Sequence, residues 1–413
     1  MAELREILDG LRLARSRGSD AVLATVVRVS GSTYRRPGAR MLITRDGVRV
    51  GAVSGGCLEQ EVARRAWWLT DTHDAALAVY DTRSSEEAAW EFGLGCQGVV
   101  QVLLERVPAA TPTPHLAFIE SHLTLRLPCV VARVIEAESG SAAVGDFVAL
   151  GAPGASTGRS ESHAADSDFT GEISNLADAE LRRRIAIEAQ HVWSTGISKS
   201  VNFPTQLGAV RVFVEYVAPP VSLLVCGAGY DALPVVKLAK QLGWDATLLD
   251  LRATTATPTR FTAADRILTS LGDLDRIGSE SRRAAAVVMT HNYADDLAIL
   301  PKLLNAPQFA YIGLLGPRSR SDALLADVAA SGVRLDESAL ARVYAPVGLA
   351  IGAETAEQIA LAIAAEIQAA LAGHKAGFLR DNPGPIHRPQ DNSDEPIASE
   401  ASGQSVSCPI QPA

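Results

Sequence analysis

Two cysteines of the first half stand in glycine-rich turns. Cys57 directly follows Gly55 and Gly56, where an apolar strand pattern changes into a helical one, and Cys96 directly follows Gly95. A helix N-terminus stabilises a thiolate, and consecutive glycine amides can point at one anion. Two thiolates on such loops would hold a soft metal centre or handle sulfur. The alternative is that both cysteines are small buried residues of tight turns, and the residue pattern supports the two readings equally.

The second half begins with a glycine turn between an apolar strand and a helix. The turn is the sequence 227–232, Gly-Ala-Gly-Tyr-Asp-Ala, and Asp250 ends the next apolar run. In dinucleotide-binding folds the first glycine permits the tight turn, the second lets the backbone approach a phosphate, and the acid accepts hydrogen bonds from ribose hydroxyls. Gly227, Gly229 and Asp250 are therefore candidate binding residues. The alternative is a Rossmann-like fold that has lost, or never had, a dinucleotide.

Further candidate residues follow later strands of the same half. His291, in the segment 290–296, could donate to a ligand or shuttle a proton, or it could satisfy loop carbonyls instead. Arg318 stands where another strand turns into a helix. Because ligands bind at the carboxyl ends of strands in open parallel sheets, we expect these loops to gather at one sheet edge.

An arginine-rich loop, residues 31–41, precedes the first cysteine motif. Guanidinium groups suit phosphate, since their planar fork can donate two parallel hydrogen bonds. The spacing of these arginines alone favours a solvated hairpin loop over a phosphate site.

Composition excludes several classes of protein. The chain has 413 residues, a net charge of −9 and 47% hydrophobic residues, which is typical of a globular protein with two or three domains. Without a basic block, nucleic acid is not an expected partner. No apolar run approaches the ~20 residues that cross a bilayer, so no membrane association is expected. The five cysteines are few and widely spaced, which predicts a reducing cytoplasm.

The pattern of elements divides the chain near residue 218. Residues 1–218 predict a mixed α+β domain with a flexible insertion at 151–174. Residues 219–373 alternate strands and helices, which predicts a Rossmann-like domain with a parallel sheet. Residues 374–413 are polar and proline-rich and are expected to form a disordered tail. The predicted fold class is α/β, with an N-terminal mixed α+β domain and a C-terminal Rossmann-like domain.

The ordered set of motifs resembles the XdhC/CoxI family, maturation factors for molybdenum hydroxylases such as xanthine dehydrogenase and carbon monoxide dehydrogenase. Segments 31–41, 54–59 and 94–98 resemble the N-terminal signatures of the family. Segments 227–250, 290–296, 311–318 and 345–352 resemble its Rossmann-like C-terminal domain.

The resemblance implies a chaperone rather than a catalyst. Members of the family bind molybdenum cofactor (molybdopterin), support exchange of an oxo for a sulfido ligand, and deliver the cofactor to an apo-hydroxylase. Cys57 and Cys96 match the characteristic cysteines of the family, which implies that they handle the molybdenum or its sulfur. The implied partners are an apo molybdenum hydroxylase, a cysteine desulfurase or sulfurtransferase, and a second copy of the chain.

Two other functions remain open. The Rossmann-like half could serve an NAD(P)-dependent oxidoreductase, although the sequence offers no recognisable hydride-transfer pair. The chain could also be a docking protein that bridges a sulfurtransferase and an apo-enzyme without touching cofactor.

Overall fold

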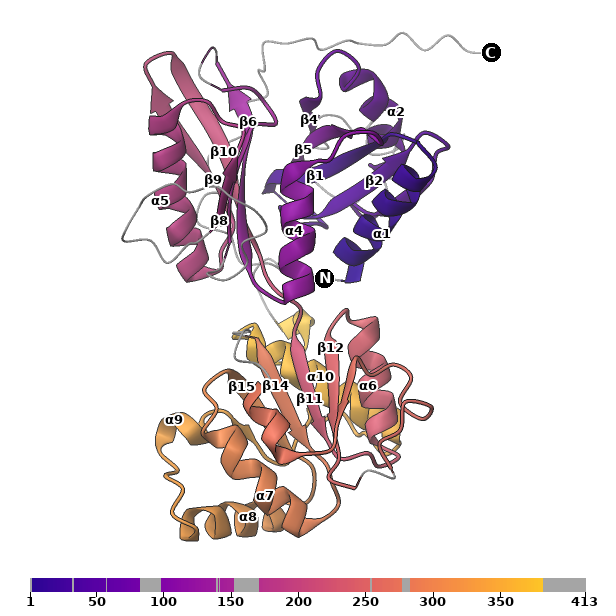
Figure 1. Cartoon of the computed structure of the whole chain (residues 1–413), viewed down its shortest axis with the longest axis vertical. Coiled ribbons are helices and arrows are strands. Elements are labelled where there is room, and N and C mark those ends of the chain that lie inside the picture. The colour runs from indigo at the N-terminus through magenta and orange to yellow at the C-terminus, as the bar shows by residue number, and fades with distance from the viewer. Residues whose placement is uncertain are drawn as a thin grey trace.

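The computed structural model describes residues 2–31, 33–56, 58–81, 98–138, 140, 142–151, 171–252, 255–276 and 283–381. Two antiparallel sheets form the first half, and one parallel sheet forms the second (Figure 1). Cys57, Gly95 and Cys96 lie outside the described residues, as does the segment from 382 to the end.

Sheet A comes from the first part of the chain and has the strand order β3-β2-β1-β5-β4. Its strands are β1 (Ala21–Gly31), β2 (Arg40–Thr44), β3 (Arg49–Gly51), β4 (Ala75–Asp81) and β5 (Gly98–Val107). Helix α2 (Glu59–Leu69) covers one face, where Val62 and Ala66 pack against Val22 and Val26 of the central strand β1.

Sheet B follows in the chain and has the order β8-β7-β6-β10-β9. Its strands are β6 (Cys129–Ala137), β7 (Phe147–Gly151), β8 (Gly171–Ser174), β9 (Lys199–Thr205) and β10 (Gly208–Val217). Helix α5 (Ala179–Thr195) covers its outer face and is capped by Asp178, whose side chain accepts the amide of Leu181.

The inner faces of sheets A and B pack on each other. Val27 and Leu103 of sheet A join Ile135 and Phe213 of sheet B in one buried cluster. Helices α1 (Ala2–Ser16) and α4 (Pro114–Leu125) bury their apolar residues in the core shared by both sheets, and Figure 1 shows α4 standing between the two sheets.

Sheet C is parallel throughout and has the order β13-β12-β11-β14-β15-β16. Its strands are β11 (Ser222–Cys226), β12 (Asp245–Leu249), β13 (Arg266–Leu268), β14 (Ala284–Val288), β15 (Phe309–Leu314) and β16 (Val343–Tyr344). Helices α6 (Ala232–Gln241) and α10 (Ala356–Leu371) cover one face, and α7 (Tyr293–Leu304), α8 (Arg318–Ala330) and α9 (Glu337–Leu340) cover the other. The first strand therefore lies between the second and the fourth, as in a doubly wound Rossmann fold, and the predicted fold class is confirmed.

The two halves meet at the amino edge of sheet C. Asp245, the first residue of β12, pairs with Arg5 of α1 at 3.0 Å and with Arg126 after α4 at 2.7 Å. A Cβ on Gly243 would lie 2.4 Å from the backbone nitrogen of Ala2, so the start of α1 packs directly on this edge. Because the strands are parallel, their carboxyl ends point away from the first half.

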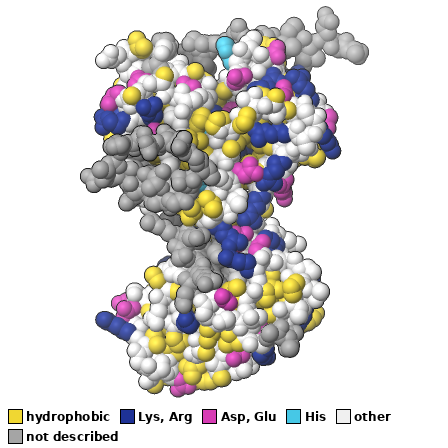
Figure 2. Space-filling view, viewed as in Figure 1, with side chains coloured by type: hydrophobic (Ala, Val, Ile, Leu, Met, Phe, Trp, Pro, Cys, Tyr) yellow, Lys and Arg dark blue, Asp and Glu magenta, His cyan; other side chains and the backbone are white. Residues whose placement is uncertain are grey.

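A cleft of ≈ 220 Å³ lies at this junction. Figure 2 shows Lys and Arg side chains gathered where the two halves meet. The arginines that line the cleft are Arg5, Arg12 and Arg126, and each is paired with a carboxylate that also lines it. The cleft is thus balanced in charge.

Two segments differ from the sequence-based expectation. Residues 171–174, expected to belong to the insertion loop, form β8 and pair with β7, because Ile173 packs against the core shared by α1 and α4; residues 152–170 of that insertion lie outside the described residues. Strand β9 was not expected from the sequence. It is an edge strand that contains Pro204, a residue that sheets admit at their edges. Within the described ranges, no helix combines the length and the apolar character that a membrane span requires.

Candidate ligand-binding site at the switch point of the parallel sheet

The glycine turn after β11 lies against the loop after β14. Gly227 has φ +117°, and a Cβ there would lie 2.4 Å from the carbonyl oxygen of Met289. Only glycine fits this close approach without strain. The turn and the loop therefore meet where the strand order of sheet C reverses, which is the position where open α/β sheets bind ligands.

His291 lies over the second glycine of the turn. A Cβ on Gly229 would lie 3.3 Å from Cδ2 of His291, and Nε2 of the imidazole is 3.4 Å from Oδ2 of Asp231. His291 has a left-handed backbone, φ +58°, and Asn292 directly after it caps α7 by accepting the amide of Ala294. The side chain is 58% exposed, so the imidazole is available to a ligand placed on the turn.

Asp250 is buried beneath the same turn. Its carboxylate accepts the amide of Ala228 at 2.7 Å and the amide of Arg252 at 2.8 Å. The guanidinium of Arg252 donates two further bonds, from Nε and Nη2, each at 3.1 Å. Burial alone would raise the pKa of Asp250, but these hydrogen bonds outweigh it and lower the pKa, so the group is a carboxylate at neutral pH.

A second arginine, Arg260, contacts the glycine turn through the carbonyl of Ala228, whose amide is bound by Asp250. Nη1 of Arg260 donates to the carbonyl of Ala228 at 2.7 Å. Arg252 and Arg260 were not identified from the sequence, although Arg252 stands only two residues after Asp250. The position of Arg252 shortly after strand β12, where the binding acid stands, could have marked it as a candidate binding residue.

The loop after β14 is fixed by a buried acid. Asp296 accepts the hydroxyl of Thr290 and pairs with Arg320 of α8 at 2.6 Å, and Arg320 also lies over the ring of Tyr293. Arg318 is exposed at the first position of α8, at the same sheet edge and one strand further along. The structure thus joins Gly227, Gly229, Asp250 and His291 in one contact set, with Arg318 on the neighbouring loop.

The Ser54 turn is built separately, in the first half. Ser54 donates its hydroxyl to Glu59 at 2.6 Å and its amide to the same carboxylate at 2.8 Å, while its Oγ accepts the amides of Gly56 and Leu58. Burial would raise the pKa of Glu59, but the hydrogen bonds to its carboxylate, from Ser54 and from the backbone of Gly56 and Glu59, together outweigh it and lower that pKa. The exposed ring of Tyr34 lies over Gly55. In the sequence, Cys57 stands between Gly56 and Leu58, and its own placement is outside the described residues.

The Ser54 turn and the glycine turn lie on different sides of the Rossmann half. Ala52, just before the Ser54 turn, donates to Glu3 of α1 at 2.9 Å, and α1 begins beside Gly243 at the amino edge of sheet C. The glycine turn lies at the carboxyl edge of the same sheet. Within one chain, the structure therefore does not bring Gly55 and Gly56 together with Gly227.

The arginine-rich loop is anchored internally. Arg35 pairs with Glu3 through two bonds of 3.1 and 3.0 Å. Arg40 pairs with Glu215 of sheet B, and both side chains are buried. These two guanidiniums are bound to carboxylates of the chain itself. They therefore anchor the loop and are not open to a phosphate ligand.

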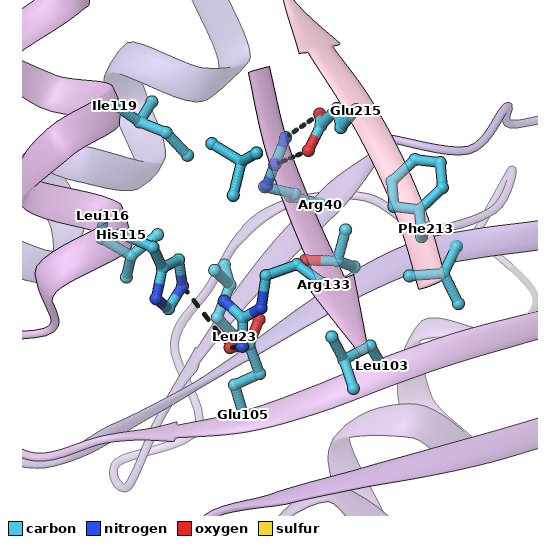
Figure 3. A pocket seen from close by; sticks show the side chains of 13 residues that line it. Leu23, Arg40, Leu103, Glu105, His115, Leu116, Ile119, Arg133, Phe213 and Glu215 are labelled. Atoms are coloured by element: carbon cyan, nitrogen blue, oxygen red, sulfur yellow. Dashed lines mark hydrogen bonds and ion pairs between the residues drawn. The ribbon is translucent and has the colours of Figure 1, made fainter. Parts of the chain in front are cut away.

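Arg40 and Glu215 belong to a buried network of charges between sheets A and B (Figure 3). In its other part Arg133 pairs with Glu105, and Nε2 of His115 lies 3.5 Å from Glu105. Burial, helped by the charges of Arg133 and Arg40, lowers the pKa of His115 well below its usual value. The cavity left here is ≈ 10 Å³, about the room for one water and too little for an organic ligand.

Metal-ligating side chains are not clustered in the described part of the chain, where no group of three His, Cys, Asp or Glu is arranged to hold a metal. Cys129 and Cys226 are buried inside strands, and burial raises the pKa of each thiol. They are therefore not reactive groups.

Comparisons with known proteins agree with this architecture. Residues 14–81 match a model described as the XdhC and CoxI family, and residues 223–367 match the XdhC Rossmann domain. The chain is 32% identical over 351 residues to a protein of Bacillus subtilis (strain 168) named as a probable xanthine dehydrogenase subunit, covering 84% of this chain and 92% of that protein. The chain belongs to the XdhC and CoxI family. The family expected from the sequence motifs is confirmed.

Two other relatives of this XdhC/CoxI chain match shorter stretches, and one solved structure matches most of the chain. The molybdenum cofactor insertion chaperone PaoD of Escherichia coli (strain K12) is 32% identical over 96 residues, 23% of this chain and 29% of PaoD. The uncharacterized protein YqeB of the same organism is 30% identical over 160 residues, 39% of this chain and 29% of YqeB. A crystal structure described as a xanthine dehydrogenase from Bacillus halodurans aligns with a TM-score of 0.67 at 26% identity, covering 90% of this chain and 97% of that one.

Proposed function

We propose that this protein is a maturation factor that carries molybdenum cofactor and delivers it to a molybdenum hydroxylase of the xanthine dehydrogenase type. The observation that carries the proposal is family membership along both halves, together with similarity to a relative named as a molybdenum cofactor insertion chaperone. The cofactor is cargo in this role, so the protein acts by binding and release rather than by catalysis.

Cys57 and Cys96 are the proposed contacts to the cargo. Thiolates suit a sulfur-ligated molybdenum centre, and the glycines beside them, Gly55, Gly56 and Gly95, leave the backbone open to a bulky guest. The bonds between Ser54 and Glu59 support this proposal, because they join two residues that flank the first cysteine in the sequence.

The proposed partners follow from the chemistry of the cargo. Replacing an oxo by a sulfido ligand needs a sulfur donor, which would be a cysteine desulfurase or sulfurtransferase. Delivery needs an apo molybdenum hydroxylase as acceptor. We also propose a homodimer in the cytoplasm, where the cofactor and its acceptor enzyme would meet.

The proposal is tested by purifying the full chain from a host that makes molybdopterin and measuring molybdenum and pterin by mass spectrometry. We expect both to be retained by the wild type, and about tenfold less by Cys57→Ala and by Cys96→Ala. Cys408→Ala, outside the cysteine motifs, is the matched control and should retain the wild-type amount.

Two results would contradict the carrier role. One is a wild-type protein that holds neither molybdenum nor pterin. The other is a double variant, Cys57→Ala with Cys96→Ala, that still binds and fully matures the hydroxylase, which would indicate a docking protein without cofactor contact.

A further inference from the structure

The acid of the Rossmann-like half is not available to a ribose. In folds that bind non-phosphorylated dinucleotides, the acid after the second strand accepts the ribose hydroxyls. Here the side chain of Asp250 is 2% exposed and already accepts four hydrogen bonds, two from backbone amides and two from the guanidinium of Arg252. A ribose diol would find no open carboxylate oxygen at this position.

Arg252 covers Asp250 and faces solvent in its place. Its side chain is 47% exposed, and its Nε and Nη2 atoms are turned to the carboxylate. The two-point contact fixes the guanidinium plane at the position that a ribose would otherwise approach. Asp295, at the start of α7, is a second acid whose charge reaches Arg252. Asp250 therefore acts on a ligand only through Arg252, as a positioning residue.

Arg260 adds a positive charge to the same place. In the described part of the chain its partners are the carbonyls of Ala228 and Thr255 and the ring of Phe261, so no carboxylate is bound to it. Ala228 is held on both sides, its amide by Asp250 and its carbonyl by Arg260. Two arginines thus stand at the turn on which a nucleotide phosphate would rest, and His291 lies over its second glycine.

We propose that the glycine turn, with Arg252, Arg260 and His291 beside it, binds a nucleotide whose ribose carries a phosphate monoester, of the NADP(H) type, in preference to its non-phosphorylated counterpart. The planar guanidinium of Arg252 can donate to a phosphate with the edge that Asp250 leaves free, and Arg260 supplies a second positive charge. His291 is placed to donate to the bridging phosphates above Gly229. This inference goes beyond the maturation role and does not rest on it.

The test is calorimetric titration of the full chain, purified from a host that makes no molybdopterin. The ligands are NADP⁺, NAD⁺, adenosine 2′,5′-bisphosphate, AMP and inorganic phosphate. We expect NADP⁺ to bind at least about tenfold more tightly than NAD⁺, and the bisphosphate to exceed AMP by a similar factor. Equal affinity for NADP⁺ and NAD⁺, no binding at millimolar ligand, or inorganic phosphate binding as tightly as the bisphosphate would each overturn the proposal.

A variant of Arg252 tests whether this residue causes the preference for NADP⁺ over NAD⁺. Arg252→Gln should reduce the NADP⁺/NAD⁺ affinity ratio to within about twofold of unity. Arg183→Gln is the matched control, since Arg183 also forms a two-point contact with a carboxylate, that of Glu180, but in the first half; it should keep the wild-type ratio. A ratio unchanged in Arg252→Gln would overturn the assignment.

Asp250 is tested through the same ratio. Asp250→Asn should lower the ratio, which a general loss of structure would not do, because such a loss weakens both ligands together. Should that variant not fold, Arg252→Gln still decides, since its side chain is exposed. The cofactor-carrier role is measured separately, on protein loaded with molybdopterin, so failure of one proposal leaves the other standing.

Discussion

Asp245 and Arg126 form an ion pair of 2.7 Å that joins the amino edge of the parallel sheet to the first half of the chain. Arg5 of α1 pairs with the same carboxylate at 3.0 Å, and Asp245 is almost fully buried by these contacts. This placement leaves the carboxyl edge of sheet C, with the glycine turn and His291, at the opposite end of the Rossmann half. In one chain, the Ser54 turn of the first half and the glycine turn of the Rossmann half are therefore apart.

Asp245→Asn should weaken the junction between the halves. The change removes the charge that two arginines share, and we expect a loss of about 1–3 kcal/mol in the unfolding free energy. Urea unfolding followed by tryptophan fluorescence measures it. Glu180→Gln, which breaks an exposed pair with Arg183, should shift the midpoint little. Equal shifts in the two variants would mean that the Asp245 pairs do not hold the junction.

Gly227→Ala should destabilise the Rossmann half. The backbone at Gly227 has φ +117°, and the new Cβ would stand 2.4 Å from the carbonyl oxygen of Met289. We expect a loss of about 2–4 kcal/mol. Gly373→Ala is the matched control, because Gly373 also has a positive φ, +65°, but has open space around it. Its unfolding free energy should fall by only about 1 kcal/mol. Thermal unfolding measures both losses. A Gly227→Ala protein that is as stable as the wild type would contradict the close approach of the glycine turn to the loop after β14.

The glycine turn was identifiable from sequence because local patterns specify it. An apolar strand, two glycines at fixed spacing and the acid after the next strand are all near neighbours along the chain. The alternation of strands and helices over residues 219–373 predicted the parallel sheet in the same local way. The capping box of Thr355 and Gln358, also a local pattern, is present at the start of α10.

The side-chain contacts that decide what each candidate residue can bind are harder to predict from the sequence. The sequence indicated that Asp250 would face a ligand, and it could not show that Arg252 folds back over the carboxylate. The Arg40–Glu215 pair joins residues 175 positions apart, so no periodicity reveals it. Strand β9 and the short strand β8 were missed because edge strands have little hydrophobic alternation. Cys57, Cys96 and Gly95 lie outside the described residues, so their roles stay predictions.

Glu59→Gln should disorder the Ser54 turn. The carboxylate accepts both the amide and the hydroxyl of Ser54, and a carboxamide would present a donor to one of them. We expect a loss of about 1–3 kcal/mol, measured by urea unfolding. Glu61→Gln on the same helix, whose pairs with Arg64 and Arg65 are at the surface, should cost no more than about 0.5 kcal/mol. Similar losses would show that Glu59 has no special role in the turn.

His115 should make stability depend on pH. Burial lowers its pKa well below the usual value, so between that lowered pKa and about 6.5 the unfolded chain binds a proton that the folded chain does not. Stability from this group is therefore full above about pH 6.5 and declines as the pH falls, by up to about 1.4 kcal/mol per pH unit.

Comparison with His115→Gln isolates this contribution. Glu105 works in the opposite direction, because burial raises its pKa and its protonation favours the folded state as the pH falls. Glu105 is present in both proteins, so the difference between their unfolding free energies, followed from about pH 7.5 to about pH 5.5, reports His115. A difference that does not change with pH would mean that His115 takes up its proton in the folded protein as readily as in the unfolded chain.

The maturation role is tested most directly by cofactor transfer. The full chain, loaded with molybdenum cofactor in a molybdopterin-making host, is mixed with an apo molybdenum hydroxylase, and the molybdenum lost from one protein is compared with the hydroxylase activity gained by the other. Hydroxylase activity should rise in proportion to the metal transferred, and Cys57→Ala should transfer little. Activation of the hydroxylase with no molybdenum leaving this protein, or full transfer by the cysteine variant, would contradict it.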